Sequence, residues 1–126
     1  MTRYERVGTR LEVSRAVGGD REAAWELLTD TRRWPEWGPS VRAVECDRRY
    51  IESGTEGRVR TPVGGVGFRV TECADYRWTW RVAGVPATGH RADAGPRAVF
   101  EVPLAAAAYA PVCALALRRI DRLLSD

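Results

Sequence analysis

The hydrophobic positions near the N-terminus alternate with polar ones, as they do in a β-strand. Residues 10–17 place Leu11, Val13 and Val17 on one face. Arg15 falls on that same face and does not fit the pattern, so a bulge or a strand end is expected there. The segment predicts one strand with a polar exception near its end.

Helical spacing follows, in a segment that is unusually rich in tryptophan. Asp20 is a suitable N-cap for an amphipathic helix that carries Trp25. A second short helix is expected to end at Trp34-Pro35, because the residue before a proline is disfavoured in helical conformation. Trp37 then lies in the exit loop. Three tryptophans so close together predict the wall of a core or of a cavity.

From residue 41 onward the pattern has a period of two. The clearest case is Arg77 to Val82, where Trp78, Trp80 and Val82 share one face. Turn residues separate most of the strand-like segments, so an antiparallel meander is expected. The predicted strands cover residues 41–51, 56–62, 66–74, 77–85, 87–93 and 97–103.

The last segment, residues 104–124, predicts a long amphipathic helix with one broad apolar stripe. Pro111 is expected to kink this helix or to mark its true start. The uncharged run 102–117 is shorter than the ~20 residues that a membrane-spanning helix needs, so stable membrane insertion is not expected.

Together these elements predict an α+β fold in the order β-α-α-β(6)-α. A curved antiparallel sheet of about seven strands would wrap around the long C-terminal helix in a helix-grip arrangement. The sheet is wider than one helix, so a cavity is expected between them. No linker interrupts the chain, and residues 1–126 are predicted to form a single domain.

Composition excludes several classes of protein. The net charge of +3 comes from arginines scattered along the chain, so no nucleic-acid partner is predicted. With one histidine and three widely spaced cysteines, neither a metal site nor a disulfide frame is expected. No glycine-rich phosphate loop joins a strand to a helix, and no cofactor is predicted. No signal peptide is visible, and we expect a cytoplasmic monomer or homodimer.

The chain resembles the SRPBCC superfamily, which includes START-related lipid-binding domains and polyketide cyclases and dehydrases. The resemblance covers residues 8–124 and is clearest for the bacterial cyclase/dehydrase branch. Its main features are the spacing W-x(8)-W-P-x-W from Trp25 to Trp37, the segment Trp78-Thr79-Trp80-Arg81-Val82, His90 and the terminal helix. The resemblance implies an apolar cavity between sheet and helix that holds a hydrophobic small molecule. It implies no fixed catalytic set, because fold does not determine function.

The first hypothesis is therefore a binding module for a lipid- or polyketide-like molecule, with ring-containing ligands favoured by the aromatic content. The expected lining combines aromatic residues of the strands with the apolar stripe of the helix. The predicted ligand-binding residues are Trp37, Phe68, Trp78, Trp80, His90, Phe100, Tyr109, Val112, Cys113 and Ala116. Packing of the tryptophans in the core, without any ligand, is the alternative.

The second hypothesis is an enzyme, a polyketide cyclase or dehydratase that uses the same cavity. His90 is the candidate catalytic acid or base, because histidine titrates near neutral pH. Arg58 or Arg60 would support an oxyanion if either pointed inward, whereas arginines on a strand usually face solvent. A protein-interaction module remains a third possibility, which an apolar patch outside the cavity would favour.

Overall fold

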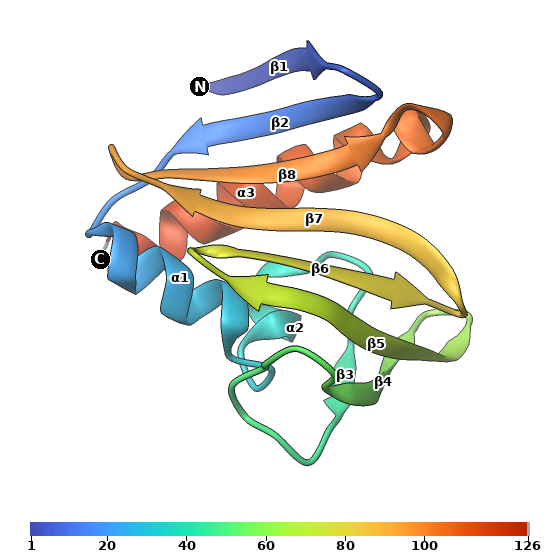
Figure 1. Ribbon diagram of the computed structural model, residues 1–126. Helices are drawn as coiled ribbons and strands as arrows, with labels where there is room; N and C mark the ends of the chain where they lie inside the picture. Colours follow the sequence, from blue (N-terminus) through green and yellow to red (C-terminus); the bar gives the residue numbers. More distant parts are fainter. Residues whose placement is uncertain (126) are drawn as a thin grey trace.

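The computed structural model describes residues 1–125 and shows one antiparallel sheet with helices against one of its faces (Figure 1). Within these residues the sheet has eight strands in the order β1-β2-β8-β7-β6-β5-β4-β3. The strands are β1 (Thr2–Val7), β2 (Arg10–Ala16), β3 (Ala43–Glu45), β4 (Glu56–Thr61), β5 (Gly64–Ala74), β6 (Arg77–Val82), β7 (Val85–Asp93) and β8 (Arg97–Pro103). The helices are α1 (Arg21–Thr29), α2 (Trp34–Trp37), the 3₁₀ helix η1 (Leu104–Tyr109) and α3 (Ala110–Leu124).

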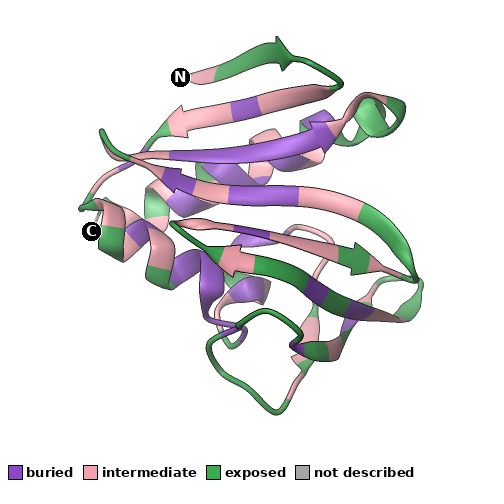
Figure 2. Ribbon diagram, viewed as in Figure 1, coloured by how far each residue is buried: buried purple, intermediate pink, exposed green. Residues whose placement is uncertain are grey.

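This architecture confirms the predicted α+β helix-grip class and adds a strand at one edge. β1 pairs with β2 in antiparallel register, from Thr2 opposite Arg15 to Val7 opposite Arg10. Nearly all of β1 is exposed, in contrast to the buried central strand β8 (Figure 2). The predicted strand 41–51 was too long, since only Ala43–Glu45 pairs with β4.

The two short helices close one end of the sheet. α1 begins as predicted: the Asp20 carboxylate accepts a hydrogen bond from the backbone N–H of Ala23 at 2.8 Å. α2 differs from the prediction, because the helix begins at Trp34 instead of ending there. Pro35 occupies the first turn, where its missing N–H costs no hydrogen bond and its fixed φ suits a helix.

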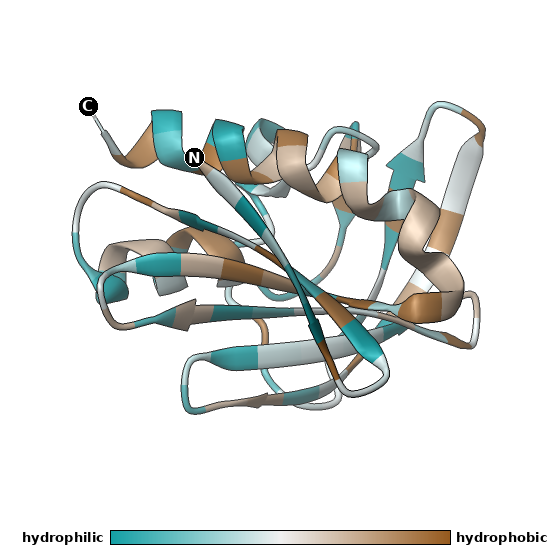
Figure 3. Ribbon diagram, turned by 90° about the horizontal axis from the view of Figure 1, so that it is seen from above, coloured by the Kyte–Doolittle hydropathy of each residue, from teal (hydrophilic) through white to brown (hydrophobic). Residues whose placement is uncertain are grey.

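α3 lies along one face of the sheet, with apolar residues on the side that faces the strands (Figure 3). Its buried residues include Cys113, Ala116, Leu117 and Ile120. Pro111 stands in the first turn of α3, directly after η1, so the alternative in which it marks the true helix start is confirmed. No helix within residues 1–125 is long and apolar enough to cross a membrane.

Arg15 keeps the orientation that its position in β2 dictates. The register of β2 is regular on both sides of Arg15, without a bulge. The side chain therefore points to the α3 face, where its Nε donates to the Asp121 carboxylate of α3 at 2.9 Å. The apparent misfit in the pattern is an ion pair between the sheet and the terminal helix.

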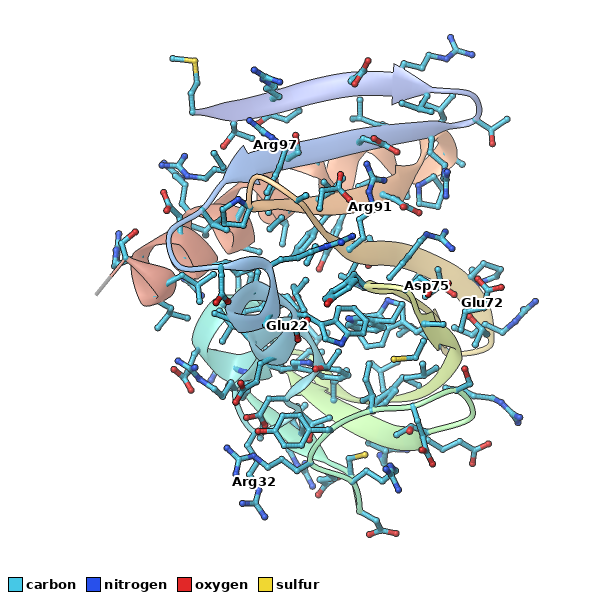
Figure 4. All side chains as sticks on the ribbon, turned by 60° about the vertical axis from the view of Figure 1, so that its left-hand side comes forward. Glu22, Arg32, Glu72, Asp75, Arg91 and Arg97 are labelled. Carbon is cyan, nitrogen blue, oxygen red and sulfur yellow. The ribbon has the colours of Figure 1, made fainter. Side chains whose placement is uncertain are left out.

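A buried carboxylate holds the opposite face of the sheet together. Glu101 of β8 is only 2% exposed and alternates with inward-facing neighbours, so it lies on the outer face. Its carboxylate accepts hydrogen bonds from Arg10 at 2.5 Å, Arg77 at 2.7 Å and Arg91 at 2.9 Å. Arg91 is labelled in Figure 4. Gly89 stands opposite Glu101 on β7, and a Cβ there would lie 2.6 Å from the carboxylate. Position 89 requires glycine, because a Cβ there would overlap with the Glu101 carboxylate.

Candidate ligand-binding cavity

A cavity of about 390 Å³ lies between the sheet, the loop after α2, and the η1–α3 segment. This volume is within the range of small-molecule sites, which are mostly apolar and contain a few polar groups. The lining comes from several elements that are distant in the sequence: Trp34, Trp37, Gly38, Pro39, Ser40, Val41, Val59, Thr61, Val66, Trp78, Trp80, Val82, Val85, Pro86, Ala87, Thr88, His90, Phe100, Pro103, Ala106, Tyr109, Val112, Cys113 and Ala116.

Most of the predicted ligand-binding residues meet at this cavity. The lining includes Trp37, Trp78, Trp80, His90, Phe100, Tyr109, Val112, Cys113 and Ala116. Phe68 does not line it. Its ring is buried and packs against Trp34 and Trp80, with centroids 5.4 and 5.6 Å away. Trp34, which was not among the predicted ligand-binding residues although its tryptophan cluster was expected to form a core or cavity wall, is also part of the lining.

Stacked rings form one wall of the cavity. Trp34 and Trp78 stack with centroids 5.2 Å apart and planes within 5°. His90 stacks on Trp78, with centroids 3.9 Å apart and an angle of 20°. Trp80 meets both Trp78 and His90 edge-on. Offset-stacked and edge-to-face geometries are the favourable ones for aromatic rings, so this wall is a rigid apolar surface.

Hydrogen bonds to α1 hold the tryptophans of α2 in place. The Trp34 indole N–H donates to the carbonyl of Leu28 at 2.9 Å, and that of Trp37 donates to the carbonyl of Leu27 at 3.1 Å. Both indoles of α2 therefore have the polar partner that a buried N–H needs. α2 therefore helps to close one end of the sheet, and α1 fixes the orientation of its two indole rings.

A polar corner of the cavity is built around Thr88. The Trp80 indole N–H donates to the Thr88 hydroxyl at 3.2 Å, and that hydroxyl lies 2.9 Å from Nε2 of His90. Since an indole can only donate, the Thr88 oxygen accepts the first bond, and its own proton is free to reach Nε2. The direction of the second bond depends on which ring nitrogen of His90 carries the proton, because the Thr88 oxygen can also accept from Nε2–H. Within residues 1–125, Nδ1 of His90 and Nε1 of Trp78 have no hydrogen-bond partner.

His90 is electrically neutral in the folded protein. Its side chain is 3% exposed, and burial lowers its pKa to about 3; the negative charge of Glu101 opposes this effect only in part. A group with so low a pKa is a poor proton acceptor at neutral pH. The nearest polar group is the Thr88 hydroxyl, which is not a base.

No side chain that is ionised at neutral pH lines the cavity within the part of the chain that the structure describes. Arg58 and Arg60 are exposed on β4, and Arg60 pairs with Glu45 at 3.0 Å. Burial raises the pKa of the Cys113 thiol to about 12, so this lining residue stays a neutral thiol. The site therefore suits a neutral guest, since an unpaired charge would be costly to bury here.

The loop after α2 and η1 meet above the cavity. The Ser40 hydroxyl and the Tyr109 hydroxyl lie 3.1 Å apart, and both residues belong to the lining. Tyr109 is 42% exposed, so this bond stands where the cavity meets solvent. A solvent-exposed hydrogen bond contributes little to the free energy of folding, so the Ser40–Tyr109 bond can open at a small cost in free energy.

No protein-family model matches the chain, and no curated protein matches it. Solved structures with the same architecture do match. XoxI from Bacillus cereus superposes with a TM-score of 0.71 at 16% identity, over 94% of this chain and 96% of that one. A protein from Rhodobacter sphaeroides gives a TM-score of 0.70 at 21% identity, over 99% and 98% of the two chains. DynU16, from the dynemicin biosynthetic locus, gives 0.69 at 19% identity, over 94% of this chain and 48% of DynU16. At these identities the similarity shows the fold alone.

Proposed function

We propose that this chain is a binding protein of the SRPBCC type that holds a neutral, hydrophobic, ring-containing small molecule between its sheet and α3. The observation that carries the proposal is the 390 Å³ cavity with its wall of stacked rings and without an ionised lining side chain. Rigid aromatic walls favour flat rings, because they stack without losing side-chain entropy. The corner at Thr88 offers one place for a polar substituent.

Two further points support this proposal. The similar structures share the fold, and one of them, DynU16, comes from the dynemicin biosynthetic locus. The cysteines of the chain are free among residues 1–125, which is in keeping with a reducing compartment and with the cytoplasmic setting that we propose. We propose a small-molecule ligand as the main partner, with the protein acting as monomer or homodimer.

We do not extend the proposal to a cyclase or dehydratase. That alternative needs His90 to exchange a proton near neutral pH, whereas burial holds its pKa near 3. The arginines expected to support an oxyanion, Arg58 and Arg60, are exposed on β4 and do not line the cavity. A binding role requires neither.

A ligand screen with a blocked cavity tests the proposal. Thermal unfolding is followed with a panel of neutral ring compounds, fatty alcohols and sterols. A ligand present at 100 times its Kd is expected to raise the Tm by about 10 °C. Val112→Trp fills the cavity from α3, and we expect it to abolish this increase.

Leu123→Trp is the matched control, because Leu123 lies on the same helix outside the cavity lining. The control variant is expected to keep the ligand-induced increase in Tm. The proposal is wrong if no compound of the panel stabilises the native protein, or if Val112→Trp is stabilised as much as Leu123→Trp.

A further inference from the structure

A second hollow, of about 620 Å³, opens on the side of the molecule where α1 faces the β5–β6 turn. We call it the α1 cleft. It shares no residue with the cavity beneath α3. Its lining is rich in aromatic and acidic side chains: Glu22, Trp25, Glu26, Thr29, Tyr50, Ile51, Cys73, Ala74, Asp75 and Tyr76. Figure 4 labels Glu22 on α1 and Asp75 at the turn.

The aromatic rings of the α1 cleft already attract cations from the protein itself. The Arg21 guanidinium carbon lies 3.8 Å from the ring centroid of Tyr76, and that of Arg49 lies 5.2 Å from the ring of Tyr50. Trp25 meets Tyr76 edge-on, with centroids 5.9 Å apart. The negative face of an aromatic ring attracts positive charge, and tryptophan does so most strongly. These arginines show which kind of group the rings accept.

The carboxylates of the α1 cleft form no direct ion pair within residues 1–125. Within residues 1–125, Glu22, Glu26 and Asp75 form no ion pair, whereas most other acidic residues pair with arginine. Glu22 and Glu26 accept hydrogen bonds only from the neutral hydroxyls of Tyr76 and Tyr50. Arg33 and Arg49 act on Glu26 from beyond ion-pair distance, so the cleft carries carboxylates that are partly balanced by arginines but directly paired with none.

The backbone of the β5–β6 turn is strained at the residues that shape the α1 cleft. Asp75 and Tyr76 adopt φ values of 53° and 63°. This left-handed conformation favours glycine and asparagine, and it is costly for a bulky residue such as tyrosine. The turn nevertheless carries Tyr76, whose ring lies beside Trp25. The two residues form the tight loop between β5 and β6, where a type I′ hairpin turn requires a positive φ at both positions, so the hairpin fixes the place of the Tyr76 ring at the edge of the cleft.

We propose that the α1 cleft is a second ligand site, which binds a small organic cation such as a quaternary or primary ammonium group. Trp25, Tyr50 and Tyr76 would surround the apolar part of the cation, and Glu22 and Glu26 would supply the opposite charge. A guanidinium of the chain already occupies one ring face of Tyr76, so the ligand enters from the open side of the cleft.

Choline and its neutral carbon isostere 3,3-dimethyl-1-butanol test the proposal, because they differ in charge and hardly in shape. The Trp25 indole N–H signal is followed by ¹⁵N–¹H NMR during each titration. We expect choline to shift this signal with an affinity about tenfold higher than that of the alcohol. The affinity for choline is expected to fall as salt is raised, because the cleft is open to solvent.

A charge-matched pair of variants separates a local site from a general charge effect. E22Q/E26Q is expected to weaken choline binding about fivefold or more, whereas E5Q/E45Q, whose residues do not line the cleft, is expected to leave it unchanged. Equal affinities for choline and the alcohol would overturn the proposal. Equal losses in the two double variants, or a Trp25 signal that neither compound shifts, would overturn it as well.

Discussion

Replacing Glu101 by Gln is expected to lower the free energy of unfolding by about 3 kcal/mol. The substitution keeps the size of the side chain and removes its charge. Arg10, Arg77 and Arg91 then surround a neutral amide in a site where the acidic side chain is 2% exposed. This value is at the low end of the free-energy losses found when a buried ion pair is broken. The arginines are 23% to 40% exposed, so water screens part of the repulsion between them.

Urea denaturation at neutral pH measures this loss, and Glu72→Gln is its control. Glu72 pairs with the same Arg77 but is 71% exposed, so we expect its loss to cost less than about 1 kcal/mol. Equal effects of the two substitutions would show that burial does not strengthen the ion pairs of Glu101 with its arginines.

Hydrogen bonds from Arg77 and Arg91 outweigh burial and hold the pKa of Glu101 below its ordinary value, so this stabilisation persists until the solution is strongly acidic.

The second large effect concerns pH and His90. Its pKa of about 3 in the folded chain lies below the ordinary value of 6.5, so the unfolded chain binds a proton first as the pH falls. The stability that neutral His90 contributes is complete above pH 6.5 and is lost progressively down to pH 3. Between pH 7 and pH 4.5 this amounts to about 2 to 3 kcal/mol, since each pKa unit corresponds to about 1.4 kcal/mol.

His90→Gln isolates this contribution, because it removes the ionisable ring and leaves the carboxylates of the protein in place. Urea denaturation of both proteins at pH 7 and pH 4.5 gives the comparison. We expect the native protein to lose more stability between these pH values than the variant, by the amount given above. A native protein that loses no more stability than His90→Gln would mean that folding does not lower the pKa of His90.

The period-two segments predicted the sheet well, because one face of each strand is buried and the other is not. β1 was not predicted, because neither of its faces is buried. Thr2–Val7 is an edge strand with almost no buried residue, so no hydrophobic alternation marks it. The bulge or strand end expected at Arg15 was wrong. A sequence pattern cannot show that Asp121 of α3 lies opposite Arg15 and pairs with it.

The cavity was predictable in outline from aromatic residues on inward strand faces and the stripe of α3. Its finer geometry depends on pairings that no local pattern contains. Trp34 enters the lining because Leu28 fixes its indole, whereas Phe68 lies behind Trp34 and Trp80. Thr88 had no signal of its own, and its importance comes from the side chains of Trp80 and His90 that converge on it.

The most direct test of ligand binding is an NMR experiment on methyl-labelled protein with the best-stabilising compound of the panel. Intermolecular NOEs are measured between the protons of the bound ligand and assigned methyl groups. We expect NOEs to the cavity-lining methyl groups of Val59, Val82, Val112 and Ala116, and none to Leu123. NOEs confined to methyl groups outside the cavity, or lining methyl signals that stay unchanged at saturating ligand, would contradict the account.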